Sequence, residues 1–177
     1  MLQVREGDLG KLGVLFERHH KLLYNFFLRL TGNREVSEDL VQDVFFRILK
    51  YRHTYQGRSA FTLWMFQIAR NARFDHLKKK KKYDAVQDDE IPEHISQDPI
   101  PVENLERYQE TALLHSALAK LADEDREVLV LSRFQNFKYK EIAELLGCAE
   151  GTIKARVHRA IKNLRDVFYK LSGEQIK

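Results

Sequence analysis

Residues 140–165 read KEIAELLGCAEGTIKARVHRAIKNLR, and this stretch decides the fold expected for the second half of the chain. Apolar residues recur at helical spacing on both sides of Gly147. Glycine accepts a left-handed backbone without steric cost, so a sharp turn is expected there. Ala143 is small at a place where a second helix would have to cross closely. The stretch therefore predicts two helices joined by a tight turn, the helix-turn-helix arrangement.

The second of these helices has an apolar and a basic face. The predicted apolar stripe consists of Ile153, Val157, Ile161, Leu164 and Phe168. The opposite face presents Gly151, Ala155, His158, Arg159 and Lys162, flanked by Thr152, Lys154, Arg156 and Arg165. Residues 151–165 contain five Lys and Arg and no acid, and long cations of this kind reach phosphates and guanine edges in a DNA groove. A DNA-reading helix is favoured over a merely solvated basic helix, for which alternating charges would serve equally well.

Helical periodicity extends over nearly all of the remaining chain, and no strand alternation is evident. The predicted fold class is all-α, with two small helical domains joined by a flexible acidic linker. Helices are expected over residues 9–30, 34–50 and 60–82, and then over 105–121, 123–134, 138–146 and 150–171. Ser59 is the expected N-cap of the third of them.

The formal charge of +4 on 177 residues hides a strong partition. Residues 1–83 carry 17 Lys and Arg against 8 Asp and Glu, whereas residues 84–110 carry nine acids against Arg107 alone. All three prolines lie inside this acidic stretch, and proline disfavours helix in its predecessor. The predicted domains are residues 1–83 and 108–177, with residues 84–107 as the linker.

Composition excludes several classes of protein. An apolar fraction of 44% with 11% aromatics is typical of a folded globular chain, not a disordered one. No apolar run approaches the roughly 18 residues of a membrane span, and residues 1–10 lack a signal-peptide core, so a cytoplasmic protein is expected. A single cysteine, Cys148, excludes internal disulfides and multi-cysteine zinc sites. No metal-ligand cluster, phosphate-binding glycine loop or nucleophile motif is evident, so we expect no cofactor, no metal and no catalytic residue.

The predicted helix 34–50 has an unusual outer face. At about 100° per residue, the side opposite its apolar stripe collects Glu35, Asp39, Gln42 and Asp43, with Phe46 at the centre. An acidic face alone is commonly just solvated. A large aromatic inside a charged face has no folding role, however, and aromatic anchors ringed by polar residues are used by protein interfaces. This face is therefore a candidate docking site for a basic partner surface.

The predicted third helix and the loop before it combine aromatic, amide and cationic groups. A strip containing Gln67, Asn71, Asp75 and Lys78 is flanked by Trp64 and Phe74, and the loop reads Tyr55-Gln56-Gly57-Arg58-Ser59. Packing explains most of these aromatics. Unpaired bases, however, stack on rings and hydrogen-bond to amides, so a surface for single-stranded nucleic acid is also plausible here.

Taken in order, these segments resemble a known family. Glu38-Asp39-Leu40-Val41-Gln42-Asp43-Val44-Phe45, Phe61-x-x-Trp64 with Ile68-Ala69-Arg70-Asn71, and Glu150-Gly151-Thr152-Ile153-Lys154 are similar to the hallmark segments of extracytoplasmic-function (ECF) sigma factors. The similarity spans roughly residues 10–82 and 108–170. It implies a bacterial RNA polymerase specificity factor that directs the core enzyme to promoters and initiates strand opening, without catalytic activity of its own.

The resemblance also implies roles for particular residues. The clamp helices of the largest polymerase subunit would contact Asp39, Gln42, Asp43, Phe46 and Arg47. The −10 element would be opened by Tyr55, Gln56, Gly57, Arg58, Ser59, Phe61, Trp64, Arg70 and Asn71. The −35 element would be read by Gly151, Thr152, Lys154, Arg156 and Arg159, with Ala155 and His158 on the same helix face, and the second domain would also touch the flap of the other large subunit. An anti-sigma factor is a further expected partner, and membrane insertion is not expected.

Two positions depart from the family pattern, and other functions stay open. Arg58 replaces a common acid in the loop, and Ala149 replaces the usual cap of the recognition helix, a loss of about 1 kcal/mol. The main alternative is a helix-turn-helix regulator that acts without polymerase, as a dimer on a palindrome. A nucleic-acid enzyme and a transcription antagonist are the remaining alternatives.

Overall fold

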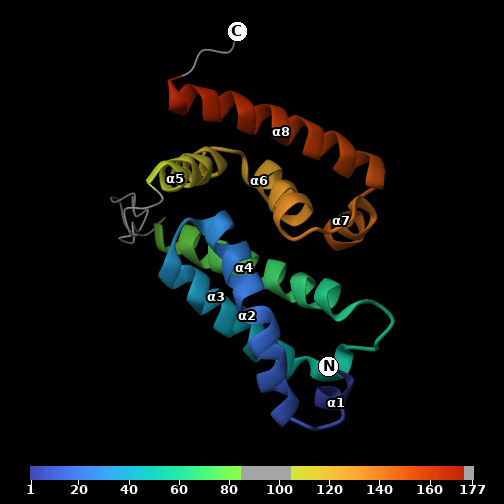
Figure 1. The fold of residues 1–177 in the computed structure, drawn as a ribbon. Coiled ribbons are helices and arrows are strands. Elements are labelled where there is room, and N and C mark those ends of the chain that lie inside the picture. The colour runs from blue at the N-terminus through green and yellow to red at the C-terminus, as the bar shows by residue number, and fades with distance from the viewer. Residues whose placement is uncertain (85–104, 174–177) are drawn as a thin grey trace. The chain divides into compact units, whose positions relative to one another are not determined.

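The computed structural model describes residues 1–84 and 105–173, and their secondary structure is entirely helical (Figure 1). The described residues form two compact units. One contains residues 1–27 and 34–84, and the other contains residues 105–173 together with Leu28–Asn33. The predicted all-α class is confirmed. The predicted linker, residues 84–107, lies almost wholly outside the described residues.

The first unit is built from four α-helices, of which α2 belongs to it as far as Phe27, and a short 3₁₀ turn. These are α1 (Leu2–Arg5), α2 (Gly10–Thr31), α3 (Arg34–Lys50), η1 (Arg52–Thr54) and α4 (Phe61–Asp84). The three long helices match the predicted spans closely, whereas α1 and η1 were not predicted. The helix α4 begins one residue later than expected, and the Ala60 carbonyl accepts its first hydrogen bonds in place of an N-cap at Ser59.

Its core forms where the apolar stripes of α2, α3 and α4 meet. Phe26 and Phe66 are fully buried, with ring centroids 5.0 Å apart in an edge-to-face arrangement. Fully buried Val44 and Ile48 contribute from α3, and Met65 contributes from α4. Burying a side chain of this size contributes about 1.5–3 kcal/mol, so this stripe fixes which face of α3 points outward.

The second unit is built from α5 (Leu105–Ala119), α6 (Asp123–Leu129), the π-helical turn η3 (Val130–Phe134), α7 (Tyr139–Leu146) and α8 (Glu150–Ser172). The long α8 packs against α5, α6 and α7 (Figure 1). A single helix was predicted over 123–134, but the Gln135 N–H donates to the Val130 carbonyl, one residue beyond α-helical spacing. The wider turn accompanies a run of five buried residues, 127–131, which exceeds one face of a regular helix.

Candidate partner and nucleic-acid interfaces

The outer face of α3 carries an exposed aromatic side chain among acids and an amide. Phe46 is 64% exposed, while its neighbour Phe45 is 7% exposed and packs against Phe16 of α2, with ring centroids 4.9 Å apart. The side chains of Glu35, Asp39 and Gln42 are exposed on the same helix. Helical geometry therefore placed these residues correctly, and we call Glu35, Asp39, Gln42 and Phe46 the docking face.

Two other residues predicted for this face, Asp43 and Arg47, pair with each other, and Arg47 also pairs with a neighbouring helix. The Arg47 Nε donates to both carboxylate oxygens of Asp43 at 3.0 Å, and its Nη1 donates to Asp75 of α4 at 2.7 Å. Burial lowers the pKa of Arg47, but the hydrogen bonds that it donates to the two carboxylates, together with their charges, outweigh burial and raise the pKa overall. Arg47, which is also paired with Asp43, thus links α3 to α4 at the edge of the docking face.

The loop between η1 and α4 rests on a cluster of four rings, which we call the aromatic floor. The Tyr55 ring lies 5.3 Å from Trp64 and 6.0 Å from Phe61, and His19 of α2 lies 5.3 Å from Phe61, each measured between ring centroids. The Tyr55 hydroxyl donates to the Ser59 carbonyl at 3.1 Å. These contacts tie both ends of the loop to the first unit.

Tyr55 supports this loop from within. Its side chain is 8% exposed, so little ring surface is available to a base. Phe61 and Trp64 are half-buried, whereas Gln56, Gly57 and Arg58 are exposed. Gly57 has φ of +72°, a left-handed conformation that favours glycine. The loop therefore presents an amide, a guanidinium and a glycine backbone above the aromatic floor.

An exposed strip on α4 continues this surface. Its exposed members are Gln67, Asn71, Phe74 and Lys78, at helical spacing. The guanidinium of half-buried Arg70 lies 5.6 Å from the centre of the Phe74 ring. Loop and strip together form a surface of amides, rings and cations, the chemistry expected for unpaired bases.

His19 was not predicted as part of this site. Burial, followed by the nearby charge of Arg18, lowers its pKa, so the neutral ring is favoured. The sequence did hold a signal, because residues 12, 15, 19, 23 and 26 follow one helical stripe that is otherwise apolar. A histidine on such a stripe packs against the interior.

The second unit contains the predicted helix-turn-helix. α7 ends at Gly147, whose φ is +66°, and the Cys148 N–H donates to the Ala143 carbonyl at 3.0 Å. No side chain caps α8 at Ala149, as the sequence indicated. The buried stripe of α8 differs from the prediction, because Ala160 is fully buried and Ile161 is 39% exposed. At 100° per residue, Ala160 lies closer to the direction of Ile153 and Val157 than Ile161 does.

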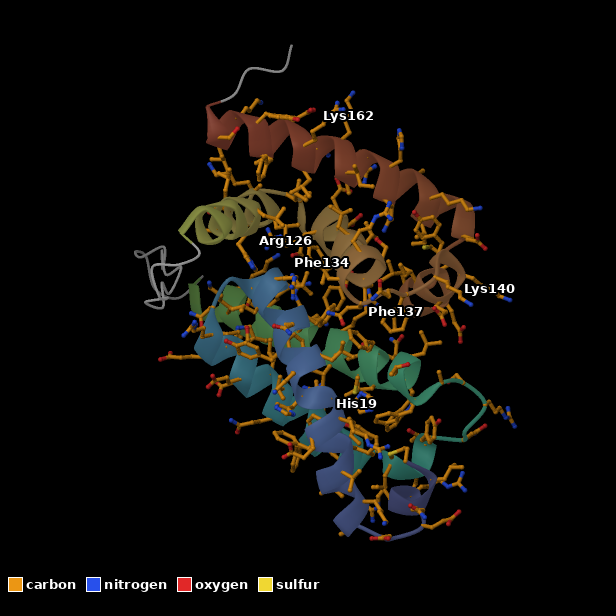
Figure 2. All side chains as sticks on the ribbon, viewed as in Figure 1. His19, Arg126, Phe134, Phe137, Lys140 and Lys162 are labelled. Atoms are coloured by element: carbon orange, nitrogen blue, oxygen red, sulfur yellow. The ribbon has the colours of Figure 1, made fainter. Side chains whose placement is uncertain are left out.

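Most residues predicted to face DNA are exposed on α8. They are Gly151, Thr152, Lys154, Ala155, His158 and Arg159, and exposed Lys162 points away from the helix (Figure 2). Lys154 pairs with Glu150 at 3.2 Å, one helical turn away. An exposed pair of this kind contributes only about 0.3–0.5 kcal/mol, so Lys154 is readily released to a phosphate.

Two residues predicted to contact DNA, half-buried Arg156 and exposed Arg159, also pair with α6. The Arg159 Nη2 and Nε donate to the two carboxylate oxygens of Asp125 at 2.6 and 3.3 Å, and the Asn163 amide donates to the same group at 3.1 Å. Asp125 is only 3% exposed. The Arg156 Nη1 lies 3.5 Å from a carboxylate oxygen of Glu124. These pairs occupy the two arginines on the side of α8 that faces α6.

The described residues provide neither a metal-binding cluster nor a membrane-spanning helix. Within residues 1–84 and 105–173, no three His, Cys, Asp or Glu side chains are grouped so that they could hold a metal ion. No helix in the same part of the chain is long and apolar enough to cross a membrane.

Comparison with known proteins gives a consistent result. Residues 15–83 match sigma-70 region 2, and residues 111–164 match sigma-70, region 4. The chain is 30% identical over 177 residues to the RNA polymerase sigma factor CarQ of Myxococcus xanthus, covering 98% of each chain. It is 34% identical to the ECF RNA polymerase sigma factor EcfG of Rhodopseudomonas palustris, over 81% of this chain and 77% of that protein.

Solved structures agree with these matches. The sigma factor RpoE of Bartonella quintana, in complex with the anti-sigma factor NepR, is 27% identical with a TM-score of 0.76, over 88% of this chain and 94% of that one. CnrH, in complex with the cytosolic domain of CnrY, shares the fold with a TM-score of 0.70 at 22% identity, over 94% of this chain and 92% of that one. Two matched sigma regions, in order and on two helical units, show that this chain belongs to the ECF RNA polymerase sigma factors of the sigma-70 family.

Proposed function

We propose that this sigma factor divides promoter initiation among three surfaces. The docking face of α3 binds the clamp helices of the largest polymerase subunit. The loop 55–59 and α4 capture the opened −10 element, and α8 reads the −35 element while its unit also contacts the flap of the other large subunit. The observation that carries this assignment is Phe46, 64% exposed on a helix whose opposite side is core.

The −10 surface is suited to a flipped base. Unstacking and unpairing one base costs a few kcal/mol, which a protein pocket must offset. Half-buried Phe61 and Trp64 offer ring surface, and exposed Gln56 and Asn71 offer amide donors and acceptors. Tyr55 acts beneath them by holding the loop through Ser59. Arg58, at a position where an acid is common, adds attraction to the DNA backbone.

The −35 surface is the exposed side of α8. Thr152, Lys154 and His158 contact base edges and phosphates, and Gly151 and Ala155 allow the helix to approach the groove. Arg156 and Arg159 keep this helix in register with α6 through Glu124 and Asp125. They are positioning residues for the −35 contact.

The acidic segment at residues 84–107 is proposed to do more than join the domains. A polyanionic segment suits a cationic channel that otherwise holds RNA, so the segment passes through the RNA path of polymerase. It also keeps two weak DNA-binding units at high effective concentration. Replacing its acids with Asn and Gln should weaken initiation, and unchanged holoenzyme formation and initiation would contradict this role.

An anti-sigma factor is a further proposed partner, because the RpoE relative is solved in complex with one. A tagged chain expressed in its host, in the cytoplasm where polymerase acts, should retain such a protein, and core polymerase should displace it. Such displacement is expected if the anti-sigma factor and core polymerase both bind the docking face. Recovery of a complex that contains the sigma factor, the anti-sigma factor and core polymerase together would argue against this.

The deciding experiment is reconstitution with bacterial core polymerase and run-off transcription on genomic fragments. The holoenzyme should start transcription at discrete promoters, while the free chain should bind the same duplexes poorly. Specific nanomolar binding of a palindrome by a dimer of the free chain would support the polymerase-independent regulator instead.

A further inference from the structure

The short helix α1 contacts the loop proposed to capture the −10 base. Val4 is fully buried, which anchors α1 to the first unit. The Arg5 Nη1 then donates to the Tyr55 carbonyl at 3.3 Å, across 50 positions of sequence. This bond ends at the first residue of the loop, on a backbone atom that a change of the Tyr55 side chain would leave in place.

A second contact from α1 reaches the middle of the loop. A Cβ added to Gly57 would lie 3.3 Å from the Leu2 Cδ2, so the Leu2 side chain packs directly against the glycine. Gly57 is the residue with φ of +72°, on which the path of the loop depends. Leu2 is nevertheless 47% exposed, so its contact with the loop does not belong to the hydrophobic core.

The loop is thus held by two independent sets of contacts. The aromatic floor and the Tyr55–Ser59 hydrogen bond fix its ends, and α1 contacts its first residue and its glycine. Fixing the backbone of a loop residue costs conformational entropy. A loop ordered before DNA arrives does not pay this cost on binding, which favours tight and selective capture of a base.

We infer that α1 is a positioning element for the −10 loop, and that Leu2 and Arg5 set how strongly the holoenzyme discriminates among unpaired −10 bases. This inference rests on the proposed role of the loop. Neither residue needs to touch DNA, because both act through the backbone at Tyr55 and Gly57.

The test uses the holoenzyme and a promoter found by run-off transcription. Open complexes are quantified on this promoter and on versions in which one −10 non-template base is substituted. Discrimination is the amount of open complex on the original promoter divided by the amount on the substituted version. Arg5→Ala and Leu2→Ala should each lower this ratio by about threefold to tenfold, the range expected for loss of one hydrogen bond or small contact. Affinity for core polymerase should stay unchanged.

Glu6→Gln is the matched control. Glu6 pairs with Arg5 Nη2 at 3.3 Å, so the variant removes an ion pair of α1 and leaves the Nη1 bond to Tyr55 in place. Its discrimination should equal that of the unaltered protein. The ratio is measured within each preparation, so a smaller folded fraction lowers both amounts and leaves the ratio intact.

A loop variant separates failure of the inference from failure of the proposed function. If Gln56→Ala lowers discrimination while Arg5→Ala and Leu2→Ala leave it unchanged, the role of α1 is overturned and the loop keeps its proposed function. If Gln56→Ala and Arg58→Ala also leave discrimination unchanged, the proposed function of the loop fails, and the inference fails with it.

Discussion

The docking face of α3 and the basic face of α8 present opposite chemistry but use arginine in the same way. On α3, Arg47 turns toward Asp75 of α4 and leaves an aromatic side chain, Phe46, exposed among acids. On α8, Arg159 turns toward Asp125 of α6 and leaves Lys154 and the rest of the basic face exposed. In both units the arginine joins two helices, and residues less engaged with the fold are left to meet a partner.

Phe46→Ala is expected to have the largest effect. Truncating an interface hot spot costs about 2 kcal/mol or more, so affinity for core polymerase should fall about 30-fold or more. Titration of labelled sigma factor with core polymerase measures the affinity, and thermal unfolding should be nearly unchanged. Leu9→Ala, at a residue that is 51% exposed outside α3, is the matched control. An equal loss of stability in Phe46→Ala would show that the ring is needed for folding.

The contrast between Lys154 and Arg159 is expected to be the next largest effect. Lys154→Ala should weaken promoter binding by holoenzyme about 5- to 150-fold, the range for one lost DNA contact, and flatten its salt dependence without altering the melting temperature. Arg159→Ala should lower the melting temperature as well, because buried Asp125 loses its charged partner and retains the Asn163 amide. If Arg159→Ala weakens DNA binding and leaves the melting temperature unchanged, the stabilising role of the Arg159–Asp125 pair is contradicted.

Gly57→Ala tests the strain in the −10 loop. Forcing a side chain into the left-handed region costs about 1–2 kcal/mol, and the added methyl group also meets Leu2. Thermal unfolding should show this loss, and the double variant with Leu2→Ala should recover part of it. If the losses of stability in the two single variants simply add in the double variant, the Leu2 side chain and the methyl group added at position 57 do not interact.

The smallest expected effect is a pH dependence of stability, to which one histidine in each unit contributes. Burial lowers the pKa of His19 in the first unit and of His115 in the second. A depressed folded-state pKa means that the unfolded chain takes up protons more readily, so stability falls as pH drops below the ordinary value of about 6.5. His19→Gln should reduce the slope of melting temperature against pH, leaving the part due to His115. An unchanged slope would place the dependence elsewhere.

Prediction from the sequence succeeded where a single helix decides the outcome. The spans of α2, α3 and α8, the exposed Phe46 and the turn at Gly147 all follow from periodicity within one segment. Prediction was less successful for α1 and η3. Four residues are too few to show a period in α1, and the π turn depends on how much of 127–131 the surrounding helices bury.

The sequence by itself determined the spans of the long helices and the outward side of α3, because a 3.6-residue repeat is a local property. The ordered hallmark segments indicated the two sigma regions. Only the tertiary structure decided which charged or aromatic residues remain on those surfaces. Arg47 meets Asp75 across 28 positions, Arg159 meets Asp125 across 34, and Arg5 meets Tyr55 across 50. Contacts at such separations form only when separate segments pack together. The periodicity of any one segment therefore cannot predict them.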